Sequence, residues 1–150
     1  MLYQLFYSSI SAKKMMKSHL YMILRQARLN NKLSNVTGLL VFVDGLFLQV
    51  LEGEESAVKN IFENIKSDKR HGDINILFEG NVKERAFPNW EMAYASPSAR
   101  DLANWSGLNN TTNIKETILN IENDKILVPH LLVELLRNID STEQNPGIAS

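Results

Sequence analysis

Two apolar segments joined by Asp44-Gly45 constrain the fold of this chain more than any other feature of its sequence. Asp-Gly between hydrophobic runs is the strongest short-range signal for a β-hairpin with a two-residue turn. We therefore expect antiparallel strands over residues 37–43 and 46–51. A two-residue turn also fixes the register, because it pairs Val43 with Leu46 and, further along, Leu40 with Gln49.

Gln49 is a polar residue in an otherwise apolar strand, Phe47-Leu48-Gln49-Val50-Leu51. Its amide has two donor hydrogens and an acceptor oxygen, and leaving such groups unpaired in a dry site costs roughly 1–3 kcal/mol. We expect the function to lie here, because a bound polar ring could satisfy the amide.

The rest of the first two thirds of the chain alternates between strand and helix patterns. Period-2 alternation predicts a strand over residues 2–8 with Tyr3, Leu5 and Tyr7 on one face. Helical periodicity follows over residues 15–30 and again from Val58 to Ile65, and further strands are predicted over 74–78 and 90–95. The order βαββαββ predicts an α+β, ferredoxin-like, five-stranded mixed sheet with two helices on one face, and a ligand could bind between those helices.

The pattern changes after residue 96. We predict a domain over residues 1–96, a C-terminal helical extension over 97–140 and a flexible tail over 141–150. Residues 109–112 are typical of a polar linker. Two helices, broken near Pro129, are predicted, and we expect their apolar faces to pack back on the domain or between subunits. Their stripes are Ile114, Ile118 and Ile121, then Leu131, Leu132, Leu135 and Ile139.

Composition excludes several classes of function. The 150 residues carry 16 basic against 17 acidic side chains, so nothing indicates a nucleic-acid surface. No apolar run is long enough to span a bilayer, and Met1-Leu2-Tyr3-Gln4 does not resemble a signal peptide, so we expect a cytoplasmic protein. The absence of cysteine removes thiol nucleophiles, thiolate metal sites and pigments attached through sulfur. His19, His71 and His130 are too scattered to predict a shared metal site.

The remaining candidates are Tyr7 on the first strand, Asn31 at a helix end, Gln49, and Trp90 with Met92 on the last strand. Taken singly, each has an ordinary explanation: Asn31 could terminate the helix, and the aromatic residues and Met92 are typical of strand surfaces or cores. Only their joint occurrence favours a functional interpretation.

At this point the chain resembles a known family, the BLUF domains, which are flavin-binding sensors of blue light. The resemblance covers about residues 2–94 and rests on six segments in the family's order and spacing. They are Leu5-Phe6-Tyr7-Ser8-Ser9, Asn30-Asn31, Thr37-Gly38-Leu39-Leu40, Phe47-Leu48-Gln49-Val50-Leu51-Glu52-Gly53, Asp68-Lys69-Arg70-His71 and Phe87-Pro88-Asn89-Trp90-Glu91-Met92.

The resemblance implies a role for each matching residue. Tyr7 would donate an electron to the photoexcited flavin, and Gln49 would lie between that phenol and the ring. Asn30 and Asn31 would contact the polar edge of the ring, and FAD is the cofactor the family usually binds. Ile23, Leu40, Phe47 and Ile65 would form the walls around the ring. Arg70 and His71 would approach its ribityl-phosphate end. Trp90 and Met92 would carry the light response.

Two positions depart from the family's pattern. Ala27 stands where many relatives carry a small hydroxyl residue near the flavin, and Asn64 stands where some carry a basic residue near the phosphate. The yield or lifetime of the photocycle and the choice between FAD and FMN are therefore open.

The chain is short, so the resemblance is to stand-alone members that have no enzymatic output domain. Such members oligomerise and act on a separate partner, here an unidentified response-regulator-like protein or effector enzyme. Two alternatives remain at this point. One is a ferredoxin-fold enzyme, either a hydrolase using Asn31, Arg70 and His71 or a flavin oxidoreductase, and the other is a light-inert interaction module.

Overall fold

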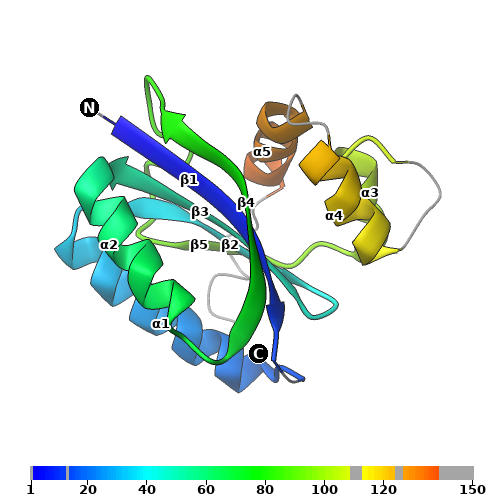
Figure 1. Cartoon of the computed structure of the whole chain (residues 1–150), viewed down its shortest axis with the longest axis horizontal. Helices are drawn as coiled ribbons and strands as arrows, with labels where there is room; N and C mark the ends of the chain where they lie inside the picture. Colours follow the sequence, from blue (N-terminus) through cyan, green and yellow to red (C-terminus); the bar gives the residue numbers. More distant parts are fainter. Residues whose placement is uncertain (1, 13, 109–112, 124–126, 139–150) are drawn as a thin grey trace.

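The computed structural model describes residues 2–12, 14–108, 113–123 and 127–138. Its centre is a five-stranded sheet in the order β4-β1-β3-β2-β5 (Figure 1). The β2–β5 pair is parallel and the other neighbouring pairs are antiparallel. The predicted α+β, ferredoxin-like mixed sheet is therefore confirmed. The strands are β1 (Leu2–Ser11), β2 (Thr37–Val43), β3 (Leu46–Glu54), β4 (His71–Asn81) and β5 (Ala93–Ala95).

The central hairpin forms as predicted. Asp44 and Gly45 both have positive φ, 49° and 81°, which a two-residue hairpin turn of type I′ requires. Leu40 consequently pairs with Gln49. On its other side Gln49 pairs with Tyr7 of β1, so two of the predicted site residues are direct cross-strand neighbours.

Two helices, α1 (Lys17–Leu33) and α2 (Glu55–Lys66), cover one face of the sheet, as predicted (Figure 1). They bury Leu20, Leu24, Val58 and Phe62 against the face of β1 that carries Tyr7. The first helix runs nearly a turn further than predicted, so the buried Asn31 lies inside its last turn. It also begins two residues later than predicted, since Met16 precedes the helix and is 62% exposed.

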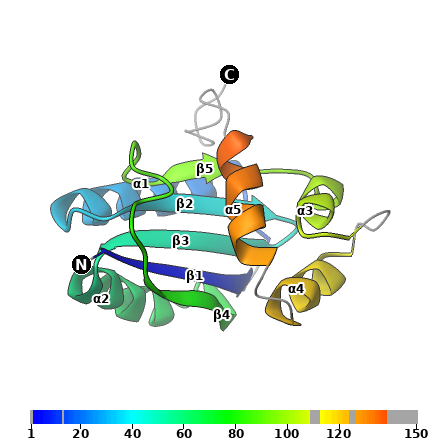
Figure 2. The same cartoon turned by 90° about the horizontal axis from the view of Figure 1, so that it is seen from above.

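Three helices pack on the other side of the sheet: α3 (Ala99–Trp105), α4 (Ile114–Asn123) and α5 (Leu127–Arg137). The helix α5 lies across that face, and α3 and α4 lie near the ends of the strands (Figure 2). Their apolar residues form one buried cluster with Phe6 and Leu48 of the sheet, so the expected packing back on the domain is confirmed. The residues that the helices contribute are Leu102, Ile121, Val128, Leu131, Leu132 and Leu135.

The prediction of only two C-terminal helices was wrong. The short helix α3 was missed because its seven residues contain too few apolar positions to show a helical period. Pro129 does not break a helix but lies in the first turn of α5, where a backbone N–H has no intrahelical partner to lose. The linker 109–112, Ile139 and the tail 141–150 lie outside the described residues.

The last strand is shorter than predicted, because β5 begins at Ala93 rather than at residue 90. Trp90 and Met92 therefore belong to the connection from β4, which crosses the face on which α5 lies (Figure 2). Phe87 anchors this connection in the core of that face. Glu52, which is fully buried, accepts hydrogen bonds from the backbone N–H groups of Ala86 and Phe87 at 2.7 and 2.8 Å.

Candidate functional site

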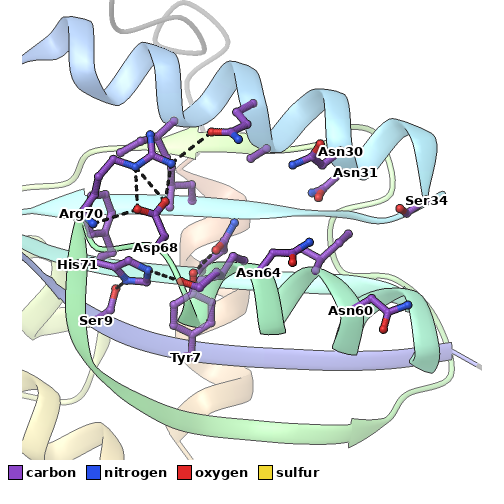
Figure 3. Close-up of a pocket in the computed structure, with 18 of the residues that line it drawn as sticks. Tyr7, Ser9, Asn30, Asn31, Ser34, Asn60, Asn64, Asp68, Arg70 and His71 are labelled. Atoms are coloured by element: carbon purple, nitrogen blue, oxygen red, sulfur yellow. Dashed lines mark hydrogen bonds and ion pairs between the residues drawn. The ribbon is translucent and has the colours of Figure 1, made fainter.

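A cavity of about 310 Å³ opens between α1 and α2 above the sheet. Its size is within the usual range for small-molecule sites. Ten of the twelve residues that the sequence singled out line this cavity (Figure 3). They are Tyr7, Ile23, Asn30, Asn31, Leu40, Phe47, Gln49, Ile65, Arg70 and His71.

Tyr7, Gln49 and Met92 form a buried hydrogen-bonded chain at the floor of the cavity. The Tyr7 hydroxyl donates to Gln49 Oε1, and Gln49 Nε2 donates to Met92 Sδ at 3.7 Å. The three side chains are 3%, 5% and 0% exposed, so water does not compete for these contacts. Burial, with a smaller effect from the charge of Asp68, raises the pKa of Tyr7 well above its ordinary value. Tyr7 is therefore a neutral phenol whose proton points at a movable amide.

Asn31 presents an unsatisfied acceptor. Its Nδ2 donates to the backbone oxygen of Glu91 at 2.6 Å, which fixes the orientation of the amide. Its Oδ1 is buried and has no hydrogen-bond partner among the described residues. Since an unpaired buried acceptor is costly, this atom is suited to an N–H group of a bound molecule.

The Met92 end of the connection is held by α1 as well as by Gln49. Arg28 Nε donates to the backbone oxygen of Met92 at 2.9 Å, next to the bond from Asn31 to Glu91. Burial lowers the pKa of Arg28. The backbone at residues 91–92 is thus held by α1, while the Met92 side chain accepts a hydrogen bond from the amide of Gln49.

Trp90 does not belong to the cavity. It packs against the hydrophobic cluster on the opposite face of the sheet, and its backbone oxygen accepts a 3.4 Å hydrogen bond from Gly38. The chain turns from one face of the sheet to the other between Trp90 and Met92, so the predicted place of Trp90 beside Met92 on the last strand was wrong.

Arg70 and His71 line the cavity with their hydrogen-bonding groups already engaged. Arg70 Nε lies 2.9 Å from both carboxylate oxygens of Asp68 (Figure 3). His71 Nδ1 lies 2.7 Å from Ser9 Oγ, and His71 Nε2 lies 2.8 Å from the backbone oxygen of Ile65. The hydrogen bonds to Arg70 lower the pKa of the Asp68 carboxyl, and those to Asp68 raise the pKa of Arg70.

Several lining residues were missed from the sequence. Ser9 could have been found, because it lies two residues after Tyr7 on the same face of β1. Asp68 stood inside a recognised segment but received no role. Gln26 and Asn60 face the cavity from the two helices and carry no signal that distinguishes them from ordinary surface amides.

The family model for sensors of blue light using FAD (BLUF) matches residues 2–93. The chain belongs to the BLUF family. BLUF domains are flavin-binding photosensors. The resemblance of the quoted segments is thereby confirmed.

The curated relatives match this chain over only a small part of their own length. The chain is 41% identical over 81 residues to photoactivated adenylate cyclase subunit alpha of Euglena gracilis, covering 54% of this chain and 8% of that protein. It is 33% identical over 102 residues to a subunit beta-like protein of the same organism, covering 68% of this chain and 12% of that protein. The chain thus spans about a tenth of the length of the curated relatives it matches.

Solved structures are similar over nearly the whole chain. The ground state of BlsA is 32% identical, with a TM-score of 0.72, covering 89% of this chain and 89% of that one. The dark-state structure of the BLUF protein BlrB, at 24% identity, shows the same fold with a TM-score of 0.74, covering 92% of this chain and 97% of that one.

None of the helices in the described residues is both long and apolar enough to cross a membrane. Nor do three or more histidine, aspartate or glutamate side chains gather anywhere in those ranges in a way that could hold a metal ion.

Proposed function

We propose that this chain is a non-catalytic blue-light receptor that binds FAD non-covalently between α1 and α2 and signals through Tyr7 and Gln49. The observation that carries the proposal is the buried chain from Tyr7 through Gln49 to Met92 at the cavity floor. The phenol of Tyr7, the amide of Gln49 and the thioether of Met92 are hydrogen-bonded one after another. Because the amide can reverse, they form a switch that needs only a change of hydrogen bonding.

The residues of the cavity fit a flavin. The unpartnered Oδ1 of Asn31 would accept from the N–H on the polar edge of the ring, and Asn30 would assist there. The ring would be walled by Ile23, Leu40, Phe47 and Ile65, with Arg70 and His71 near its substituent chain.

Flavin supplies, when bound, a chromophore that becomes a strong oxidant on absorbing blue light. Tyr7 would then give up an electron to that oxidant and pass its proton toward Gln49 Oε1, to which its hydroxyl already donates. Gln49 would reverse or tautomerise as the electron returns to Tyr7, because an amide carries a donor at one end and an acceptor at the other. An ionised glutamate at this position could only accept hydrogen bonds, and a leucine could neither donate nor accept them.

The output requires more than one hydrogen bond. A net hydrogen bond is worth about 1 kcal/mol, whereas moving an equilibrium from 1:99 to 99:1 needs about 5.5 kcal/mol. We propose that Met92 and the connection containing Trp90 carry the change into β5 and the C-terminal helices, and that a symmetric homo-oligomer multiplies it. The effector would be a separate partner, response-regulator-like or an enzyme. The absence of cysteine is consistent with a cytoplasmic location.

The enzymatic alternatives have less support. Asn31, Arg70 and His71 do line one cavity, as a hydrolase would need. However, Arg70 is paired with Asp68, and the ring nitrogens of His71 already have Ser9 Oγ and the backbone oxygen of Ile65 as partners.

The purified chain tests the proposal. We expect a yellow protein whose flavin absorption shifts to the red under blue light and returns in the dark. Protein that stays colourless after FAD is supplied would refute it. Yellow protein without a reversible shift would support the light-inert module instead.

A further inference from the structure

Charge is distributed unevenly along this chain. Residues 1–43 contain six of its 16 lysine and arginine residues and none of its 17 aspartate and glutamate residues. The other ten basic residues and all 17 acidic residues lie in 44–150, so the formal charge is +6 over the first region and −7 over the second. The near-neutral total hides this asymmetry. Such an asymmetry indicates a surface that meets an anionic partner.

Four of these six basic residues lie on α1. Lys17, Arg25 and Lys32 are exposed there, and Lys14 is exposed just before the helix begins. Arg28 differs, because it is half-buried and donates to the connection before β5. None of the ion pairs among the described residues involves the four exposed cations. Their charge is therefore directed at solvent or at a partner.

The same segment exposes large apolar side chains. Met16, Met22, Leu29 and Leu33 are the four most exposed large hydrophobic residues of the part of the chain that the structure describes, at 62%, 66%, 60% and 80%. Met22, Leu29 and Leu33 are spaced by seven and four residues, so they form one line along the outer side of the helix. We call these three residues the α1 ridge. At 1.5 Å per residue the ridge is about 16 Å long.

The ridge does not stabilise the domain, because the opposite side of α1 already packs on the sheet through Leu20 and Leu24. Arg25 and Lys32 each follow a ridge residue by three positions, so both flank the ridge on the same side. Methionine and leucine side chains beside cations are typical of a helix that lies on an anionic membrane.

Other anionic partners fit this face less well. A nucleic acid would use the cations but would leave the apolar ridge in contact with water or phosphate. A partner protein would need a groove that matches the ridge in shape. A bilayer accepts a convex ridge of any shape, because its lipids are fluid, and its headgroups supply the negative charge.

We infer that the outer side of α1 is a docking surface for an anionic membrane, on which the chain lies without spanning it. The α1 ridge enters the boundary between headgroups and acyl chains, and the exposed cations contact the lipid phosphates. The region 44–150, with its formal charge of −7, is repelled by the same membrane. This opposition orients the domain with α1 toward the lipid.

Cosedimentation of the purified chain with lipid vesicles tests this. Vesicles of equal parts phosphatidylserine and phosphatidylcholine should bind the chain, and vesicles of phosphatidylcholine alone should not. Arg25→Gln/Lys32→Gln should weaken binding by about 25-fold, because each cation near an anionic surface contributes about a factor of five. Met22→Gln/Leu29→Gln should weaken it by at least about tenfold, because two large apolar side chains no longer enter the bilayer.

Two matched controls remove the same kinds of group from the helices on the other side of the sheet. Arg100→Gln/Arg137→Gln removes two exposed cations from α3 and α5. Leu119→Gln/Val133→Gln removes two exposed apolar side chains from α4 and α5. Both controls should bind like the wild type. Circular dichroism of every variant checks its folding, which these exposed positions should not alter.

Absence of binding to the phosphatidylserine vesicles would overturn the inference. An equal loss in the α1 variants and their controls would also overturn it, since only total charge or total apolar exposure would then matter. Unchanged binding of Met22→Gln/Leu29→Gln would overturn the insertion of the ridge. Binding to polyglutamate but not to vesicles, with loss in Arg25→Gln/Lys32→Gln, would assign this face to an acidic protein instead.

Discussion

Replacing Glu52 with glutamine should destabilise the fold and loosen the connection that positions Met92. Glu52 is fully buried and its carboxylate accepts three hydrogen bonds. They come from Gln4 Nε2 at 2.8 Å and from the backbone N–H groups of Ala86 and Phe87 at 2.7 and 2.8 Å. Glutamine keeps one acceptor oxygen but has an NH2 group in place of the other. That NH2 group would face an N–H donor that now bonds to Glu52.

The magnitude follows from these contacts. At least one hydrogen bond to a charged group, worth roughly 1.5–3 kcal/mol, is lost, and those that remain are weaker because the charge is gone. The lower cost of burying a neutral amide offsets part of the loss. We expect the free energy of unfolding to fall by about 2–3 kcal/mol, a large share of the roughly 5–15 kcal/mol of a typical domain.

Urea unfolding at one fixed FAD concentration measures this. With a denaturant dependence of about 2 kcal/mol per molar urea, the midpoint should fall by roughly 1–1.5 M. Glu84→Gln is the matched control, because Glu84 is an exposed residue on the same connection and the substitution changes the charge equally. Its effect should stay within about 0.5 kcal/mol. Equal midpoints for the two variants would refute the role assigned to Glu52.

Further predictions concern the switch and its surroundings. Tyr7→Phe and Gln49→Leu should each stay yellow but lose the normal red-shifted state, and an unaltered photocycle in either would remove that residue from the mechanism. Met92→Leu keeps the core volume and should cost less than about 1.5 kcal/mol in urea unfolding, yet change the dark-recovery rate because the sulfur acceptor of Gln49 is gone. Burial, then the hydrogen bond to Glu79, raises the pKa of Tyr3 from 10.0 to about 12. The folding stability that the neutral Tyr3 hydroxyl contributes is therefore complete below pH 10 and is lost as the pH rises toward 12. Phenolate absorbance should show this late titration in the wild type but not in Tyr3→Phe.

Local sequence determined the parts of the site that lie within one hairpin or on one face of one element. The Asp44-Gly45 turn set the pairing of Leu40 with Gln49, because a two-residue loop leaves a single register. Strand alternation put Tyr7 on the same face of β1 as Tyr3 and Leu5, the face that α1 and α2 cover. These inferences depend on backbone geometry over a few residues, which composition and spacing encode directly.

Tertiary structure decided the contacts between distant segments. The sequence placed Trp90 and Met92 together on a strand, but the connection turns between them, so only Met92 reaches Gln49. The pairing of Arg70 with Asp68 was likewise invisible, because two neighbouring charges can face solvent or each other. Glu52 was part of a recognised segment, but its three donors lie 34, 35 and 48 residues away.

The sequence by itself therefore determined the family, the sheet and the buried amide at its centre. Only the fold decided what that amide touches. The physical reason is that a side chain's partners across distant segments depend on how every intervening turn directs the chain, while its own face depends only on its place in a strand.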